Sequence, residues 1–153
     1  MSSELDEIQA MIQEMVIEDA REVYSETVID HAMNPRNVGT IPNADGFGRV
    51  TGSCGDTMET WLKVRNGTIE KITFMTDGFG TSAASGSMVT EMAKGKSLIE
   101  SLGIGQQDVL DALGGLPEES EHCALLASNT LKAAIRDCIA MQKEPWKKAY
   151  RQQ

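Results

Sequence analysis

The chain has 153 residues, of which 41% are hydrophobic and 24% are charged, so its length and composition are typical of one folded domain rather than of a disordered segment. Its formal net charge of −9 argues against non-specific binding of nucleic acid, because the phosphate backbone would repel the protein. Partners with basic surfaces are favoured instead.

Three further features of the sequence indicate the cellular compartment. No apolar run approaches the ~18 residues of a membrane-spanning helix, and the first residues lack the basic and apolar regions of a secretory signal. Three cysteines, an odd number in a chain without an export signal, indicate reduced thiols rather than a disulfide framework. We therefore expect a cytoplasmic protein that does not bind membranes.

The first predicted element is helical and covers residues 5–33. Apolar residues recur there at spacings of three and four, as they do on one face of a helix. The acidic pair at 18–19 interrupts the pattern, so one long helix and two shorter helices are both compatible with it. Pro35 and Gly39 end the helical stretch, because proline cannot donate the helical hydrogen bond.

Three strands follow, at residues 47–53, 58–64 and 68–76. The second strand alternates, which places Leu62 on one face and Trp61 on the other. Asn66 and Gly67 lie before the third strand and predict a tight hairpin, since both central positions of a type I′ turn require positive φ. The strands are therefore expected to form an antiparallel meander with one side packed against helices.

The C-terminal half of the chain is predominantly helical. Helical patterns cover residues 81–94, 98–102, 108–113 and 121–143. Small residues in the first of these helices would let it lie close to the sheet, and the last carries an apolar stripe that includes Cys138.

These elements predict an α+β fold, a small antiparallel three-stranded sheet packed against a helical layer. We expect a single domain over residues 1–153. Within it, residues 1–20 form an additional N-terminal helical segment, and residues 21–143 form the main domain.

Two short runs carry the residues with metal or sulfur chemistry. Cys54 and Asp56 are separated by one glycine, so in extended backbone their side chains point the same way. His122 and Cys123 adjoin the start of the last predicted helix, whose N-terminus favours the thiolate form of a nearby cysteine. Two thiolates, a carboxylate and an imidazole supply four donors, as many as a tetrahedral zinc or iron site needs. Spacing alone leaves a second interpretation open, in which Cys54 is a buried thiol near a turn aspartate.

The other candidate residues have structural explanations. Cys138 lies about 20 Å further along the last helix than Cys123, so the two cannot share a metal ion. His31 ends a predicted helix, where a positive charge is favoured, and is not counted among the ligands. The glycine-rich turn at 78–80 is not followed by Gly-Lys-Ser/Thr, and no Ser-His-Asp arrangement is indicated. Neither nucleotide binding nor serine-hydrolase chemistry is expected.

Short motifs follow one another in a recognisable order along most of the chain. They lie at residues 28–31, 34–39, 54–56, 88–91, 94–98, 122–124 and 131–135. Together these motifs resemble one family, the NifU/IscU-type scaffold proteins for iron–sulfur cluster assembly, over residues 24–137. The resemblance implies a fold like that of the NifU/IscU N-terminal domain.

The resemblance also implies a carrier rather than an enzyme. Family members bind a [2Fe–2S] cluster, or zinc in its absence, receive sulfur as a persulfide from a cysteine desulfurase, and pass the cluster to apo iron–sulfur proteins. By resemblance, Cys54 is the first ligand, Asp56 is a weak oxygen ligand, and Cys123 is both a ligand and the persulfide acceptor. His122 is then a neighbour or an alternate ligand. A homodimer is compatible with such a carrier.

The chain departs from the family pattern at two places. Phe79 occupies the position of the family's second cysteine, and a phenyl ring can neither bind iron nor accept sulfur. A [2Fe–2S] cluster needs four protein donors, so the four donors named above still suffice in number, with a neutral imidazole in place of a thiolate. Residues 116–120 carry two glutamates where many family members have a Leu-Pro-Pro-x-Lys motif that a chaperone recognises. Cluster release assisted by that chaperone is therefore not expected.

These departures leave three functional hypotheses. The first is a scaffold that binds iron or an iron–sulfur cluster and hands it on. The second is a relative that has lost cluster binding, holds zinc or no metal, and acts as an interaction module for a desulfurase. The third, an independent zinc hydrolase, is disfavoured because no general base stands out beyond the ligands themselves.

Overall fold

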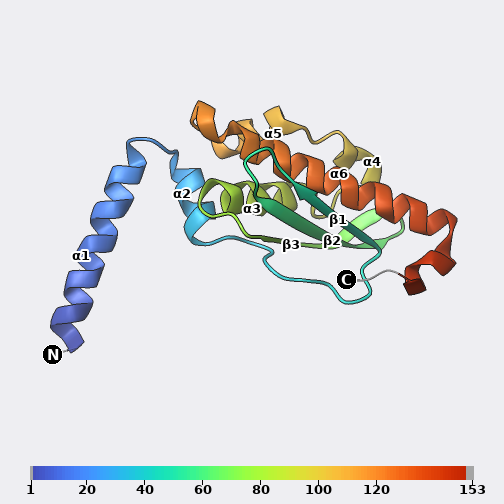
Figure 1. The fold of residues 1–153 in the computed structure, drawn as a ribbon, viewed down its shortest axis with the longest axis horizontal. Helices are drawn as coiled ribbons and strands as arrows, with labels where there is room; N and C mark the ends of the chain where they lie inside the picture. Colours follow the sequence, from blue (N-terminus) through green and yellow to red (C-terminus); the bar gives the residue numbers. More distant parts are fainter. Residues whose placement is uncertain (1, 151–153) are drawn as a thin grey trace.

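The computed structural model describes residues 2–150 and contains one three-stranded antiparallel sheet with helices packed along one face (Figure 1). The elements in chain order are α1 (Ser2–Arg21), α2 (Glu26–Met33), β1 (Gly46–Thr51), β2 (Thr57–Arg65), β3 (Thr68–Thr76), α3 (Thr81–Ala93), α4 (Leu98–Leu102), α5 (Gln106–Leu113), the 3-10 helix η1 (Glu118–Ser120), α6 (Glu121–Lys143) and the 3-10 helix η2 (Pro145–Tyr150). The α+β fold predicted from the sequence is confirmed.

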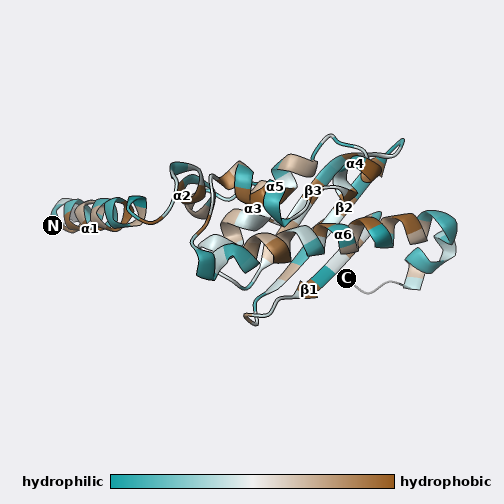
Figure 2. Cartoon of the chain, turned by 90° about the horizontal axis from the view of Figure 1, so that it is seen from above, coloured by the Kyte–Doolittle hydropathy of each residue, from teal (hydrophilic) through white to brown (hydrophobic). Residues whose placement is uncertain are grey.

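The N-terminal helical stretch consists of two helices rather than one. The break lies at residues 22–25, later than the acidic pair, because Ser25 caps α2: its Oγ accepts a hydrogen bond from Val28 N at 3.1 Å. Helix α1 extends away from the sheet (Figure 1), and Figure 2 shows hydrophobic residues along it. Its large apolar side chains, such as Ile12, are exposed, so α1 contributes little to the core.

The sheet has the order β1-β2-β3, with Leu62 of β2 paired to Gly46 on one side and to Ile72 on the other. Asn66 and Gly67 both have positive φ, 54° and 77°, so the predicted hairpin turn is confirmed. A register shift follows Lys63, where the regular alternation of the strand ends.

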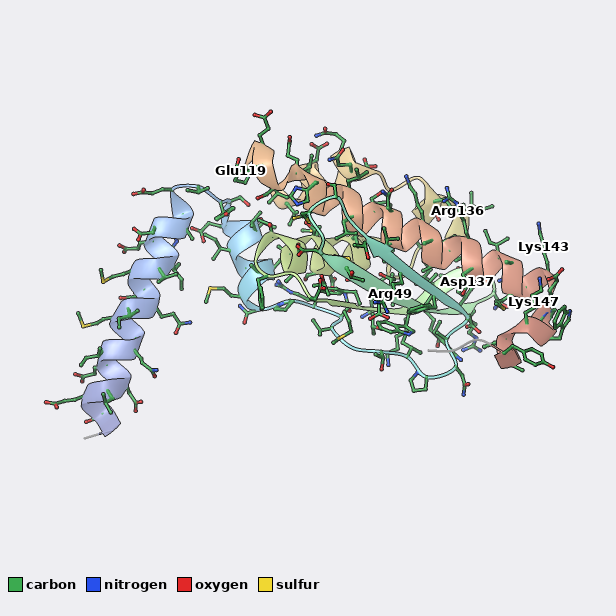
Figure 3. All side chains as sticks on the ribbon, viewed as in Figure 1. Arg49, Glu119, Arg136, Asp137, Lys143 and Lys147 are labelled. Carbon is green, nitrogen blue, oxygen red and sulfur yellow. The ribbon has the colours of Figure 1, made fainter. Side chains whose placement is uncertain are left out.

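Helices α3 and α6 cover one face of the sheet and enclose the core, which includes Leu62, Phe74, Val89 and Leu131. Helix α6 lies so close to β1 that a Cβ atom on Gly48 would stand 2.5 Å from the backbone nitrogen of Ala134. Asp137 of α6 (Figure 3) accepts a hydrogen bond from the backbone N–H of Phe47 at 2.8 Å. This contact ties the C-terminal part of α6 to the first strand.

The opposite face of the sheet carries a second, smaller core cluster. Trp61 is buried there with Ile41 and Ala44, and its ring lies 5.3 Å from that of Phe47, centroid to centroid. The connection between α2 and β1 therefore covers this face, and a parallel bridge between Val38 and Phe74 attaches it to β3. The sheet is covered by helices on one face and by a loop on the other.

Candidate metal and sulfur site

Three chain segments meet at one end of the sheet: the β1–β2 loop at residues 52–56, the first turn of α3, and the first turn of α6. Asp56 and Ser82 join the loop to α3 through a 2.8 Å hydrogen bond. Ser82 and Cys123 join α3 to α6 at 3.4 Å. A Cβ atom on Gly52 would lie 3.5 Å from the side chain of Leu126, so the same loop also lies against α6.

Cys123 occupies the first turn of α6 and is 3% exposed. Its Sγ lies 3.3 Å from Thr81 Oγ1 and 3.4 Å from Ser82 Oγ, and 3.7 Å from His122 Nε2. The sulfur thus has two hydroxyl groups and one imidazole as polar neighbours. These groups give the Cys123 thiol hydrogen-bond partners inside an otherwise closed surface.

Asp56 is held by the loop that carries it. The backbone N–H of Gly52 donates to the Asp56 carbonyl at 2.8 Å, and the N–H of Gly55 donates to the Gly52 carbonyl at 3.0 Å. The next residue, Thr57, donates its backbone N–H to the carboxylate of Asp77 at 2.7 Å. The loop is therefore closed on itself and attached to the segment that leads into α3.

Cys54 lies in this loop and is exposed, so the interpretation of Cys54 as a buried thiol is wrong. Gly55, which follows it, has a φ of 91°, a conformation that favours glycine. Within residues 2–150, no group of three His, Cys, Asp or Glu side chains is close enough to hold a metal ion. The donor types suit zinc or iron, but within the described residues the four side chains do not converge on one point.

Phe79 lies between two glycines in the turn before α3 and is 92% exposed. Its neighbour Gly80 has a φ of 57°, and the exposed ring lies outside the core. The ring lines a groove of about 440 Å³, whose walls also include Val16 of α1 and Ile29 and Met33 of α2. An apolar surface therefore borders the site where the family pattern has a thiol.

His31 and Cys138 lie outside the site. Cys138 is fully buried in the core, as its place on the apolar stripe predicts. His31 is buried, with its Nδ1 at 2.7 Å from Ser87 Oγ, and burial lowers the pKa of its imidazole below the ordinary value of 6.5. The expectation of a favoured positive charge at this helix end is wrong, because burial, and after it the nearby Arg36, disfavour the protonated imidazole.

Sequence reasoning missed the two hydroxyl residues of the site. Thr81 was expected only as the first residue of a helix, and Ser82 was given no role. The sequence feature that could have pointed to them is their position directly after the glycine turn. In the structure this turn places the first turn of α3 beside the Cys-Gly-Asp motif. Because this proximity depends on how α3 packs on the sheet, the sequence pattern alone did not reveal it.

Together the fold and the site define a class of protein: a small α+β domain with cysteine, aspartate and histidine side chains at one end of its sheet. The chain belongs to the NifU-like N-terminal domain family, whose model matches residues 23–145. The family expected from the sequence motifs is thus confirmed. Helix α1, Ser2–Arg21, lies outside the matched region.

Several proteins are similar to this chain. The iron–sulfur cluster assembly scaffold protein IscU 1 of Archaeoglobus fulgidus is 49% identical over 116 residues, covering 75% of this chain and 76% of the relative. The IscU scaffold protein of Escherichia coli K12 is 48% identical over 119 residues, covering 74% of this chain and 92% of the relative. The crystal structure of the N-terminal part of a NifU-like protein from Brucella abortus has the same fold, with a TM-score of 0.62 at 20% identity over 77% of this chain and 95% of that one.

No helix within residues 2–150 combines the length and the hydropathy that a bilayer-spanning helix requires.

Proposed function

We propose that this chain is a scaffold for iron–sulfur cluster assembly. It binds iron or a [2Fe–2S] cluster built with sulfur from a cysteine desulfurase, and it transfers that cargo to apo iron–sulfur proteins. It acts as a carrier and not as an enzyme. Support comes from its family, from relatives named as IscU scaffold proteins, and from the site residues it retains.

One observation carries this proposal: Asp56 and Cys123 reach a common atom, Ser82 Oγ, from different elements. A carboxylate and a thiolate side by side are donors that ferric and ferrous iron both accept. Cys54 and His122 are the remaining donors, and both lie in segments that adjoin this pair. The exposed loop of Cys54 allows that thiol to approach the cargo and to withdraw from it.

Sulfur delivery requires a nucleophilic thiol, for which we propose Cys123. Its thiolate attacks the outer sulfur of a cysteine persulfide on the desulfurase. A new S–S bond forms on Cys123, the old S–S bond breaks, and the desulfurase cysteine leaves as a thiolate, so electrons and atoms balance. Because Cys123 is 3% exposed, the Cys54 loop or the Phe79 turn must move before this attack.

A second candidate function is supported by Phe79. A ring in place of the family's second cysteine leaves a neutral imidazole as the fourth donor, which stabilises ferric iron less than a thiolate does. Two thiolates, one imidazole and one carboxylate are sufficient ligands for a tetrahedral zinc ion. The alternative is therefore a zinc-binding relative that docks to a desulfurase and carries no cluster.

The experiment that separates the two is anaerobic reconstitution with ferrous iron and sulfide, comparing the unsubstituted protein with Phe79→Cys. Visible sulfur-to-iron charge-transfer bands in both proteins support the scaffold. We expect the bands to persist longer in Phe79→Cys after dilution into chelator, because a thiolate replaces a weaker donor.

Phe79→Ser is the matched control, since it removes the ring without adding a thiolate. Bands in Phe79→Cys alone, together with zinc in the protein as purified, would favour the zinc-binding alternative. Equal persistence in Phe79→Cys and Phe79→Ser would mean that the ring, and not the missing thiolate, limits cluster retention.

Residues Glu118 and Glu119 bear on the release of cargo. Both are exposed beside the start of α6, where Glu119 is labelled in Figure 3. They stand where many family members carry the lysine-containing chaperone motif. We therefore propose that the protein releases its cargo without that chaperone.

A further inference from the structure

Ser82 lies between two of the proposed ligands, on the first turn of α3. It is 1% exposed, its Oγ donates to Asp56 Oδ2 at 2.8 Å, and the same Oγ lies 3.4 Å from Cys123 Sγ. A buried hydroxyl with two polar partners has a defined orientation, because turning it away would leave a buried polar group unsatisfied.

The single proton of the serine hydroxyl defines the direction of these contacts. Ser82 gives this proton to Asp56, so a lone pair of the Ser82 oxygen faces the sulfur of Cys123. The Thr81 hydroxyl, 3.3 Å from the same sulfur, approaches it from the preceding residue. Two consecutive hydroxyls of α3 therefore hold the Cys123 side chain in place.

The backbone at Gly78 closes over the Asp56–Ser82 pair. A Cβ atom at this position would stand 2.5 Å from Asp56 Oδ2 and 2.7 Å from Ser82 Oγ. Only a glycine leaves room for the pair, because real Cβ atoms do not approach other atoms this closely. The pair is thus confined on the side of the glycine turn.

We infer that Ser82 is a positioning residue for the cargo ligands. By donating to Oδ2 of Asp56, it fixes the orientation of the carboxylate and leaves Oδ1 as the oxygen for a metal ion, and it keeps the Cys123 sulfur on the same side. The inference rests on the proposed function, since it requires Asp56 and Cys123 to bind metal. Groups that hydrogen-bond to metal ligands generally change metal affinity by about 10- to 100-fold.

The test measures the affinity for Zn²⁺, and anaerobically for Fe²⁺, by competition with a chromophoric chelator. The proteins compared are the unsubstituted chain, Ser82→Ala, Ser82→Thr and Ser85→Ala. Ser85 is the matched control: it is a buried serine one turn further along α3, and its Oγ donates to the Thr81 carbonyl at 2.7 Å rather than to Asp56 or Cys123. Thermal unfolding of each variant establishes that it is folded.

We expect Ser82→Ala to weaken metal binding by about 10- to 100-fold, and Ser85→Ala to change it by less than about threefold. Ser82→Thr keeps the hydroxyl and restores most of the affinity. If Ser82→Thr fails to fold, the metal affinities of Ser82→Ala and Ser85→Ala are sufficient to test the inference.

Unchanged affinity in Ser82→Ala overturns the inference and leaves the proposed function intact. Equal losses in Ser82→Ala and Ser85→Ala also overturn it, because a general loss of α3 packing then accounts for both. If the unsubstituted protein binds neither metal nor cluster, the proposed function fails, and the inference fails with it.

Discussion

Asp56 and Cys123 contact the same oxygen atom, Ser82 Oγ, although the two residues lie far apart in the sequence. The two distances, 2.8 Å and 3.4 Å, place Asp56 Oδ2 and Cys123 Sγ no more than about 6 Å apart. Each residue comes from a different element, and these elements pack around one core. The proximity of the two side chains is therefore a property of the whole domain and not of a local turn.

Substitution of the two site cysteines is expected to separate their roles. Cys123→Ser should abolish acceptance of sulfur from a cysteine desulfurase, because its hydroxyl cannot form the S–S bond, whereas Cys54→Ser should retain it. Mass spectrometry of the intact protein after incubation with desulfurase and cysteine measures the added sulfur. Undiminished loading of Cys123→Ser, or loss of loading in Cys54→Ser alone, would assign the acceptor role to Cys54.

The close approach of α6 to β1 makes Gly48 sensitive to substitution. In Gly48→Ala the new Cβ would meet the backbone of Ala134 at 2.5 Å and that of Thr130 at 2.7 Å, so α6 must shift away from the strand. We expect a loss of about 1–3 kcal/mol in the free energy of unfolding, measured by urea denaturation. Gly52→Ala is the control, since its Cβ makes an ordinary 3.5 Å contact with Leu126, and it should cost less than about 0.5 kcal/mol. Similar urea midpoints for Gly48→Ala and Gly52→Ala would contradict the conclusion that close packing of α6 on β1 requires glycine at position 48.

His31 is expected to make the protein less stable in mild acid. Burial lowers the pKa of His31 in the folded state below its ordinary value of 6.5, and the nearby Arg36 lowers it further, against the opposing effects of Asp30 and Glu91. The unfolded chain therefore binds a proton more readily than the folded one. The associated stability is fully present above pH 6.5 and is lost as the pH falls through the folded-state pKa.

The measurement is thermal unfolding between pH 5 and pH 8, for the unsubstituted protein and His31→Gln. The unsubstituted protein should lose more stability below pH 6.5 than His31→Gln does, and the His31 resonances should titrate below 6.5. Parallel pH profiles for the two proteins would rule out this contribution.

Helix α1 is expected to be dispensable for folding of the main domain. Its large apolar side chains are exposed, and it lies outside the region matched by the family model. Deletion of residues 2–21 should shift the Tm by less than about 4 °C, which corresponds to roughly 1 kcal/mol for a domain of this size. Zinc affinity should be unchanged. A larger drop in Tm, or loss of cooperative unfolding, would show that α1 belongs to the folding unit.

The sequence was sufficient to predict the elements of the fold because their signals are local. The alternation of the second strand, the Asn66-Gly67 turn and the proline and glycine residues at helix ends each act over a few residues. Less local features were predicted less well. The break between α1 and α2 depends on the Ser25 cap, whose hydroxyl also donates to the carbonyl of Leu113, and the burial of Trp61 depends on where the α2–β1 connection lies.

The ligand-type residues could likewise be read from the sequence, since their chemistry belongs to the residues themselves. The sequence alone was sufficient to propose Cys54, Asp56, His122 and Cys123 as candidate donors and to show Phe79 as a departure from the family pattern. Only the tertiary structure decided that Cys123 is buried, that Cys54 is exposed, and that Ser82 lies between Asp56 and Cys123. The reason is physical: which side chain faces which is determined by how α3 and α6 pack on the sheet, and that packing depends on every residue of the shared core.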